Sequence, residues 1–427
     1  MNDLATRPLS DAIDKIIDFR GKTPLKLGME WGGGDIRALS ANNVTQGKID
    51  FSKECYYASE ALYNKWMNKG SCAQGDILLT MEAPLGNVAQ IPDDKKYILS
   101  QRTVLIKLNQ NKILNDYAFY LFSFDNFQKE LYKNATGSTV IGIQQKKLLK
   151  IELTYPFLIT NQKKIAKILS TCDTVISQTE QAIEKYQAIK QGMMTDLFTR
   201  GIDVNTGKLR SSYEEQPDLY KESELGWIPR DWEVEAISSF ADVVTGSTPS
   251  TLNKYYYDGQ FMFISPSDIS NQKYIYQTEK TLTKLGLLVS RVIPTGSICV
   301  VCIGSTIGKI ALTTSNSTTN QQINSIIPYD KDLSEFVFYA SKHYLNNQLK
   351  VEAGLQAVPI VNKSSFEKLL LPTCNDIESK MITKQLTVLD CKIDVEKNTL
   401  KKYQQIKAGL MQDLLTGKVE VQTDDVA

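Results

Sequence analysis

The chain has 427 residues, of which 42% are hydrophobic and 23% charged, and its formal net charge is +1. This length and composition indicate a soluble globular protein of two or three domains. The near-zero charge excludes a polycation, so a nucleic-acid site must be a local patch or be completed by a partner. No apolar run reaches the roughly 18 residues of a membrane span. The polar N-terminus does not resemble a signal peptide, and the seven cysteines are scattered. We therefore expect a cytoplasmic protein without a disulfide framework and without a membrane partner.

The first half of the chain predicts a mixed α+β domain followed by a long helix. "GDILLT" (75–80) and "TVLIKL" (103–108) are short, β-branched runs typical of strands, and "NDYAFYLFSFDNFQKELY" (115–132) is helical in character. A Pro-free segment at 159–199 then has apolar residues at steps of three and four, which is typical of a helix packed on another long helix. The polar stretch that follows has no apolar period and is interpreted as a linker.

The second half repeats this order. "GSICVVCI" (296–303), "KIALTT" (309–314) and "INSIIPY" (323–329) predict strands, and "LSEFVFYASKHYLNNQL" (333–349) predicts a helix. A second long helix follows. The predicted organisation is 1–158 first domain, 159–199 first helix, 200–225 linker, 226–373 second domain, 374–416 second helix and 417–427 tail.

An internal repeat underlies this symmetry. "YQAIKQGMMTDLFT" (186–199) and "YQQIKAGLMQDLLT" (403–416) are identical at nine of fourteen positions, at an offset of 217 residues. "GKTP" (21–24) corresponds to "GSTP" (246–249), and 75–91 corresponds to 296–312. Since each long helix would leave its apolar stripe exposed if alone, we expect the two to pack on each other, antiparallel. The apolar stripes comprise Ile165, Leu169, Cys172, Ile176, Ile183, Tyr186, Met193 and Leu197 in the first helix, and Ile382, Leu386, Leu389, Ile393, Leu400, Tyr403, Leu410 and Leu414 in the second.

Three motifs suggest chemistry but favour ordinary structural roles. "GSTIGK" (304–309) has one residue too few between its glycines for a phosphate loop, and Ile310 replaces the hydroxyl that would bind magnesium. Cys299 and Cys302 lie in an apolar strand run without a second cysteine pair, so we expect buried cysteines and not a zinc or redox site. The single histidine, His343, excludes histidine-dependent triads. The chain therefore has the character of a binding protein, with no catalytic, cofactor or metal site of its own.

Polar turns recur at matching places in both repeats. Asn, Gln and Arg can form paired hydrogen bonds to base edges, and Ser, Thr, Lys and backbone amides suit phosphates. Ordinary turn chemistry explains any one of these turns equally well, but different side chains at equivalent places are what two readers of different DNA words would have. The candidate DNA-contacting residues are Arg20, Lys22, Thr23, Ser40, Asn42, Asn43, Gln101, Arg102, Ser138 and Thr139 in the first repeat, and Ser247, Thr248, Ser265, Ser267, Asn320, Gln321 and Gln322 in the second.

With these features, the chain resembles the specificity subunit of type I restriction–modification enzymes over essentially its whole length. The resemblance rests on "GKTP" and "GSTP", on "GWIPRDW" (226–232), and on the helix endings "MMTDLFTRGIDV" and "LMQDLLTGKVEV". The first repeat lacks the "GWIPxxW" opening. The resemblance implies an α+β fold in which two target-recognition domains are held apart by two antiparallel helices.

The same resemblance implies a function. Each domain would read one half of a bipartite, gapped site in double-stranded DNA. Two methyltransferase subunits and two motor-nuclease subunits would join the chain, and S-adenosylmethionine, ATP and Mg would bind to those partners. Two alternatives remain open at this point: a specificity subunit of a related methyltransferase system without a motor, and a coiled-coil scaffold that binds only protein.

Overall fold

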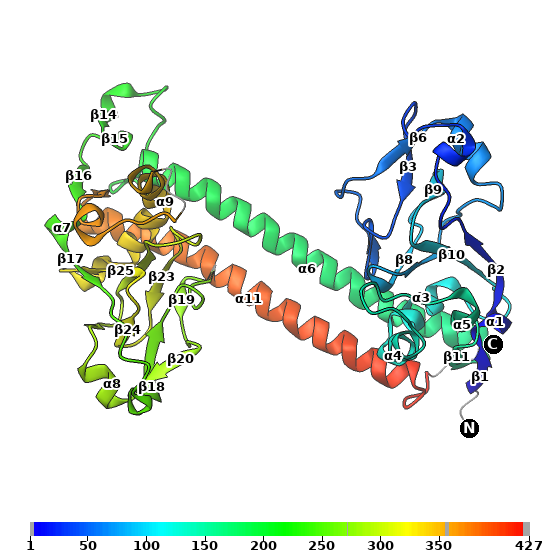
Figure 1. Ribbon diagram of the computed structural model, residues 1–427. Coiled ribbons are helices and arrows are strands. Elements are labelled where there is room, and N and C mark those ends of the chain that lie inside the picture. The colour runs from blue at the N-terminus through cyan, green and yellow to red at the C-terminus, as the bar shows by residue number, and fades with distance from the viewer. Residues whose placement is uncertain (1–3, 271, 355–357, 422–427) are drawn as a thin grey trace. The chain divides into compact units, whose positions relative to one another are not determined.

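The computed structural model describes residues 4–270, 272–354 and 358–421. The chain forms two compact units, each drawn from both halves of the sequence (Figure 1). Unit 1 contains Met1–Glu180 with Thr399–Ala427, and unit 2 contains Gln181–Asn398. Each unit therefore has one globular body, one part of the first long helix and one part of the second.

The body of unit 1 is built on two larger sheets, a terminal strand pair and the short antiparallel pair β4–β5. The pair β1–β11 is antiparallel, one sheet has the order β2-β10-β7-β8, and the other has the order β6-β3-β9 with β3 parallel to β9. The strands are β1 (Leu4–Pro8), β2 (Ile13–Asp18), β3 (Ile36–Leu39), β4 (Val44–Thr45), β5 (Lys48–Ile49), β6 (Tyr56–Ala58), β7 (Ile77–Met81), β8 (Leu85–Gln90), β9 (Tyr97–Leu99), β10 (Thr103–Leu108) and β11 (Glu152–Pro156). The helices are α1 (Leu9–Ala12), η1 (Leu25–Leu27), α2 (Glu60–Trp66), α3 (Asn115–Ser123), α4 (Asp125–Lys133) and α5 (Gln145–Leu148).

The body of unit 2 has the same plan. The antiparallel pair β16–β26 corresponds to β1–β11, the sheet β17-β25-β22-β23-β19 to β2-β10-β7-β8, and the sheet β20-β18-β24-β21 to β6-β3-β9, with β18 parallel to β24. The strands are β16 (Glu233–Ala236), β17 (Ala241–Thr245), β18 (Tyr257–Ile264), β19 (Tyr274–Ile275), β20 (Lys280–Leu282), β21 (Val292–Ile293), β22 (Ile298–Val301), β23 (Ile310–Thr313), β24 (Ser317–Thr319), β25 (Ile323–Pro328) and β26 (Leu370–Thr373). The helices are α7 (Ile237–Phe240), η3 (Lys254–Tyr256), α8 (Lys284–Leu288), η4 (Lys331–Leu333), α9 (Ser334–Ala353) and α10 (Lys363–Phe366). The predicted α+β fold and internal repeat are confirmed.

The two long helices are α6 (Ile159–Arg200) and α11 (Asp376–Leu415). None of the sixteen residues of the predicted apolar stripes is exposed. In unit 1, Ile165 and Leu169 of α6 share a core with Leu414 of α11, and in unit 2, Leu197 shares a core with Ile382 and Leu386. Within unit 1, Ile165 shares a core with Leu414 and Asp173 pairs with Lys407, and within unit 2, Lys190 pairs with Asp390 and Leu197 shares a core with Ile382. The residue number therefore falls along α11 as it rises along α6, so the helices run antiparallel within each unit.

A reciprocal polar contact joins the helices in each unit. In unit 1, the Tyr120 hydroxyl donates to Asp173 of α6 at 2.7 Å, and Lys407 of α11 forms an ion pair with the same carboxylate. In unit 2, the Tyr339 hydroxyl donates to Asp390 of α11, which forms an ion pair with Lys190 of α6. The lysine ammonium lies 5.5 Å from the Tyr120 ring centre in unit 1 and 5.3 Å from the Tyr339 ring centre in unit 2. Each junction thus takes its carboxylate from one repeat and its lysine from the other.

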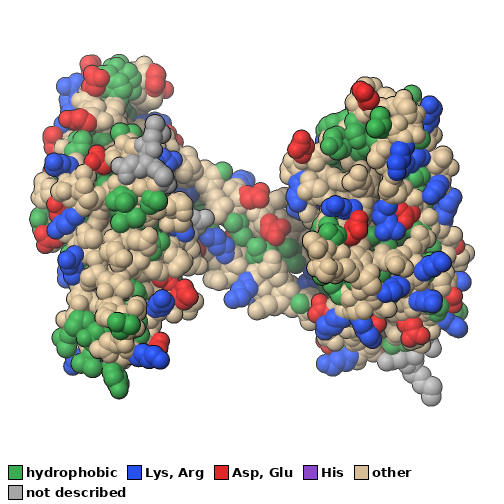
Figure 2. All heavy atoms as spheres, in the orientation of Figure 1, with side chains coloured by type: hydrophobic (Ala, Val, Ile, Leu, Met, Phe, Trp, Pro, Cys, Tyr) green, Lys and Arg blue, Asp and Glu red, His purple; other side chains and the backbone are tan. Residues whose placement is uncertain are grey.

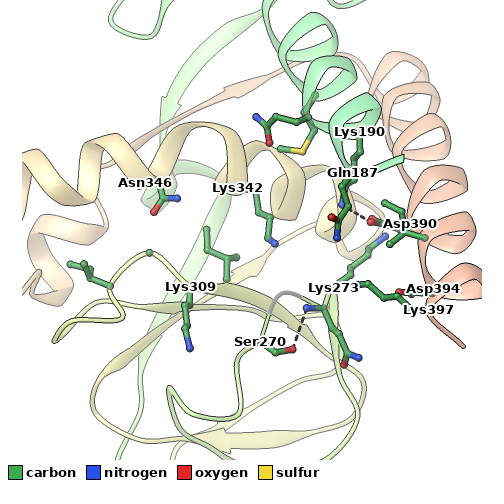
Figure 3. Close-up of a pocket in the computed structure, with 17 residues that line it drawn as sticks. Gln187, Lys190, Ser270, Lys273, Lys309, Lys342, Asn346, Asp390, Asp394 and Lys397 are labelled. Carbon is green, nitrogen blue, oxygen red and sulfur yellow. Dashed lines mark hydrogen bonds and ion pairs between the residues drawn. The ribbon is translucent and has the colours of Figure 1, made fainter. Parts of the chain in front are cut away.

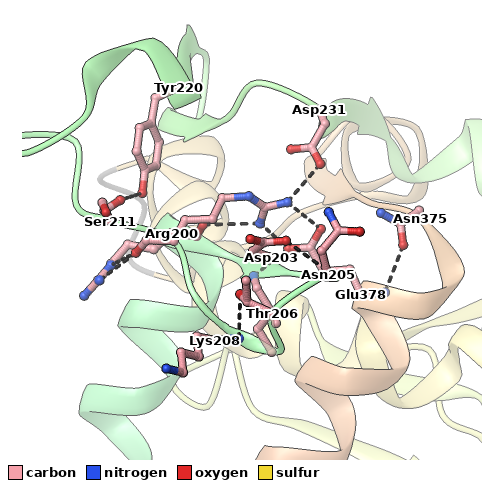
Figure 4. Close-up of polar contacts among 12 residues, drawn as sticks. Arg200, Asp203, Asn205, Thr206, Lys208, Ser211, Tyr220, Asp231, Asn375 and Glu378 are labelled. Carbon is pink, nitrogen blue, oxygen red and sulfur yellow. Dashed lines mark hydrogen bonds and ion pairs between the residues drawn. The ribbon is translucent and has the colours of Figure 1, made fainter.

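The segment predicted as a polar linker is folded in unit 2 (Figure 4). It contains β12 (Ile202–Asp203), β13 (Lys208–Leu209), η2 (Pro217–Leu219) and β14 (Tyr220–Ser223). β12 pairs with β13, and β14 pairs with β15 (Gly226–Pro229), which directly follows the predicted linker. Arg210 donates both Nη groups to Glu378 near the start of α11, and Glu378 also accepts the backbone N–H of Ile202 at 2.7 Å. Burial opposes the charge of Arg210, but its hydrogen bonds to Glu378 raise the pKa of the guanidinium above its ordinary value.

Gly201 explains how the chain leaves α6 so close to this ion pair. Its φ of +66° is left-handed, a conformation typical of the residue that ends a helix. A Cβ at this position would lie 2.3 Å from Arg210 Nη1 and 2.4 Å from Glu378 Oε1, so a larger residue would displace the pair.

Among the described helices, none combines the length and hydropathy that a bilayer crossing requires.

Candidate nucleic-acid interface

In unit 1, candidate residues from separate turns line two adjoining cavities. The first cavity, of about 440 Å³, includes Lys22, Thr23, Ser40, Asn42 and Gln101 in its lining. The second, of about 380 Å³, shares Ser40, Asn42 and Gln101 and adds Arg102. The Ser40 and Gln101 turns meet because β3 and β9 run parallel and end side by side. The turn after β2, with Lys22 and Thr23, lines the same cavity.

Backbone contacts hold these turns in register. Ser100 N–H donates to the Leu39 carbonyl at 2.8 Å, which joins the Gln101 turn to the Ser40 turn. The Asn43 side chain accepts from Ser40 N–H and Oγ–H at 3.2 and 3.0 Å. Asn43 is buried, and its amide nitrogen donates to the Lys53 and Glu54 carbonyls, so we assign it a structural role and leave it out of the interface.

Some of the other candidate side chains in unit 1 are bonded within the chain, and others are exposed. Arg20 forms an ion pair with Asp18 at 2.7 Å, and Lys22 donates to the Trp66 carbonyl at 2.8 Å. Ser138 and Thr139 are exposed in a loop whose ends, Thr136 and Gly142, pair with each other. Gly142 also pairs with Glu82, which places this loop beside the second cavity.

Unit 2 brings its own candidates together in the same way. Asn320 N–H donates to the Ile264 carbonyl at 2.9 Å, the counterpart of the Ser100 contact. Thr248 Oγ1 donates to Gln321 Oε1 at 2.6 Å, and Ser247 N–H donates to the Thr319 carbonyl at 2.9 Å. The turn that holds Ser265 and Ser267 is closed by Asp268, whose carboxylate accepts from Ser265 N–H at 2.8 Å, as Asn43 does in unit 1.

The conformation of "GSTP" has a steric cause. A Cβ on Gly246 would lie 2.2 Å from the Thr319 carbonyl oxygen, which no larger side chain tolerates. Gly246 therefore lets the 245–248 turn lie directly against the end of β24. Among the described residues, the two repeats thus place equivalent turns at one surface in each unit, with different side chains on them.

Sequence reasoning missed three residues of this surface, namely Trp31, Tyr56 and Glu82. Trp31 and Tyr56 line the first cavity, with parallel rings whose centres are 5.3 Å apart. Glu82 lies 3.7 Å from Arg102 at the second cavity. The exposed tyrosine pair at 56–57 was the one signal available for the aromatic wall, because the partner ring is 25 residues away in the sequence.

A third cavity, of about 450 Å³, lies between the helices and the body of unit 2 (Figure 3). Its lining includes five lysines and two aspartates, namely Lys190, Lys273, Lys309, Lys342, Lys397, Asp390 and Asp394. Lys190 is paired with Asp390, and Lys273 lies 3.0 Å from Glu335. Burial lowers the pKa of Lys342, and the positive charge of Lys190 lowers it further. An excess of positive charge in a partly desolvated cavity suits an anion such as phosphate.

The motifs given structural roles behave as expected. Cys299 and Cys302 are buried, and burial raises the pKa of each thiol to about 12. In "GSTIGK", Gly304 and Gly308 have φ of +92° and +87°, typical of a glycine turn between β22 and β23. Within the described residues, no group of three His, Cys, Asp or Glu side chains is arranged to hold a metal ion. Basic and acidic side chains are interspersed on the face of each unit that Figure 2 shows.

The comparison with known families decides the identity of this double unit. The model of the type I restriction modification DNA specificity domain matches residues 1–190 and again 229–407. The chain belongs to this family. The two matched regions coincide with the two repeats, so the duplication seen in the sequence is a duplication of the specificity domain.

Relatives and solved structures agree with this family. The chain is 28% identical over 402 residues to the putative type I restriction enzyme MjaX specificity subunit of Methanocaldococcus jannaschii, which covers 89% of this chain and 86% of the relative. It is 29% identical over 361 residues to the type I restriction enzyme HindI specificity subunit of Haemophilus influenzae, covering 71% and 78%. The fold is similar to that of the type I restriction–modification S subunit from M. genitalium, with a TM-score of 0.61, 14% identity and coverage of 97% and 96%.

Proposed function

We propose that this specificity subunit reads a bipartite, gapped site in double-stranded DNA, one half with each unit. The observation that carries the proposal is the convergence of equivalent turns at one surface in each unit, with Ser40, Asn42 and Gln101 in unit 1 and Ser265, Ser267 and Gln321 in unit 2. Amide and hydroxyl side chains at such turns match the donors and acceptors of base edges. Because the side chains differ, the two half-words should differ.

The chain itself is proposed to do no chemistry. None of the candidate turns contains a histidine, and the one histidine of the chain, His343, is stacked on Phe198 with ring centres 5.6 Å apart. Two methyltransferase subunits would dock on the chain and two motor-nuclease subunits would join for cleavage. S-adenosylmethionine, ATP and Mg would then bind to those partners.

A domain exchange tests the reading function. Replacing residues 1–155 with the same region of another family member should change one half of the methylated word and leave the other half and the gap unchanged. The measurement is methylated-motif sequencing of DNA from cells that carry the complete system. A change in both half-words, or none in either, would contradict the proposal.

We also propose that the α6–α11 pair sets the gap between the half-words and provides the surface on which methyltransferase subunits dock. The reciprocal junctions at Asp173 and Asp390 give each unit the same helix register, as two equivalent docking sites require. Four residues inserted within 177–185, with four more within 394–402, lengthen a helix by about 6 Å. At about 3.4 Å per base pair, the gap should grow by roughly two pairs. An active variant that keeps the original gap would mean that the partner subunits set the spacing.

A further inference from the structure

The two units carry different chemistry at one pair of equivalent positions. In unit 1, Met81 N–H donates to the Arg102 carbonyl at 2.8 Å, and in unit 2, Cys302 N–H donates to the Gln322 carbonyl at the same distance. Since β10 and β25 each begin one residue later, Arg102 and Gln322 occupy the same place before corresponding strands.

The residues that follow Met81 and Cys302 are equivalent as well. Glu82 pairs antiparallel with Gly142, and Ile303 pairs antiparallel with Ile360. Unit 1 thus presents a carboxylate and a guanidinium where unit 2 presents an aliphatic side chain and an amide.

In unit 1 the pair is close but open to an outside ligand. Arg102 Nε lies 3.7 Å from Glu82 Oε1, and the side chains are 47% and 41% exposed. Within the described part of the chain, the Arg102 guanidinium donates no hydrogen bond, so its donors remain available. Arg102 also has a left-handed φ of +68°, which is strained for a residue with a Cβ. Strain of this kind is typical of functional positions.

In unit 2 the equivalent site is neutral. Asn320 Nδ2 donates to Gln322 Oε1 at 3.0 Å, which orients the amide. Gln322 Nε2 lies near the turn that follows Ile303, since a Cβ on Gly304 would be 3.9 Å from it. Ile303 and Gln322 are both partly exposed. The amide therefore keeps N–H donors for a ligand, next to an apolar side chain.

We propose that Glu82 and Arg102 read a G·C base pair in the first half-word, and that Ile303 and Gln322 read an A·T pair at the equivalent place in the second. Arginine binds guanine O6 and N7 with two hydrogen bonds, and glutamate accepts from the cytosine amino group. Glutamine binds adenine N6 and N7, and an apolar side chain contacts the thymine methyl group. The inference rests on the proposed function, because it assigns one base pair within each half-word.

Exchange of the pair tests the inference in the complete system. Glu82→Ile together with Arg102→Gln should convert one G·C pair of the first half-word to A·T, with every other position unchanged. Preference for the original pair should fall by roughly 5- to 150-fold, which corresponds to about 1–3 kcal/mol. Methylated-motif sequencing, with methylation rates on matched oligonucleotides, measures both effects.

Two single variants serve as controls. Arg102→Lys keeps the charge but loses the paired donors, so the complex should accept other base pairs at that single position while the rest of the word stays unchanged. Arg102→Gly relieves the left-handed strain, so the thermal midpoint should be kept or raised while the same position relaxes. A relaxed position in a variant of undiminished stability separates base reading from a folding defect.

Three results would overturn the inference. The first is a native first half-word without a G·C pair. The second is an unchanged word and rate in the exchange variant, and the third is weakening that is uniform over all positions. Each of these leaves the proposed function intact provided that the domain exchange still changes one half-word, so failure of the inference and failure of the function are distinguishable.

Discussion

Removing one partner of the buried ion pair between the folded linker and α11 should strongly destabilise unit 2. Glu378 is fully buried and Arg210 is 10% exposed, whereas Asp231, the second carboxylate on Arg210, is 56% exposed. The same guanidinium therefore has one buried and one solvated partner. Replacing a carboxylate by an amide can be done at each partner in turn.

The expected magnitudes follow from this difference in burial. Removing one partner of a buried pair costs about 3–5 kcal/mol because the other charge stays desolvated. Glu378→Gln retains one acceptor for the Ile202 N–H, so we expect about 3 kcal/mol. Asp231→Asn breaks a solvated pair and should cost less than about 1 kcal/mol. For a unit of this size, about 2–4 °C per kcal/mol gives a shift of roughly 6–12 °C for Glu378→Gln.

Thermal unfolding of the full chain, followed by calorimetry and far-UV circular dichroism, measures both shifts. If unit 1 and unit 2 melt separately, the transition of unit 2 alone should move. Equal shifts for the two variants would refute the reasoning, because they would mean that burial of Glu378 does not decide the strength of the pair. A shift below about 2 °C for Glu378→Gln would refute it too.

Three further predictions concern the helices and the lysine-rich cavity. Asp390→Asn should destabilise the protein more than Asp173→Asn in chemical denaturation, because the Asp390 side chain is 16% exposed and the Asp173 side chain 36%; the reverse order would exclude burial as the cause. Lys342→Met should raise the thermal midpoint, since burial of Lys342 disfavours its charge. The same variant should reduce, by about one, the slope of log K against log salt concentration for DNA binding by the complete complex, because one phosphate contact is lost. An unchanged slope would exclude a phosphate contact. A chain of residues 1–200 should self-associate. The 217-residue offset of the repeat relates Lys190 to Lys407, the partner of Asp173, so two copies can form an Asp173–Lys190 ion pair twice. A monomer at micromolar concentration in light scattering would contradict this.

The sequence by itself determined the fold class, the duplication and the helix pair. Helical burial repeats every three or four residues, so the stripe from Ile165 to Leu197 is readable without any knowledge of what covers it. The repeated ending at 186–199 and 403–416 required only comparison of the chain with itself. Strands at 75–80 and 103–108 could be predicted as well, because Gly-bounded β-branched runs are local signals, and the structure has β7 and β10 there.

Tertiary structure alone decided which polar residues face outward. Asn43 and Asn42 are neighbours of the same type, yet one closes a turn in the interior and the other lines a cavity. Likewise the apparently featureless linker is folded because Arg210 meets Glu378, 168 residues away. A polar side chain leaves no periodic trace of its partner in the sequence, since a hydrogen bond depends on two atoms brought together by the whole fold. For the same reason the pairing of Glu82 with Arg102 became visible only where the ends of β7 and β10 meet.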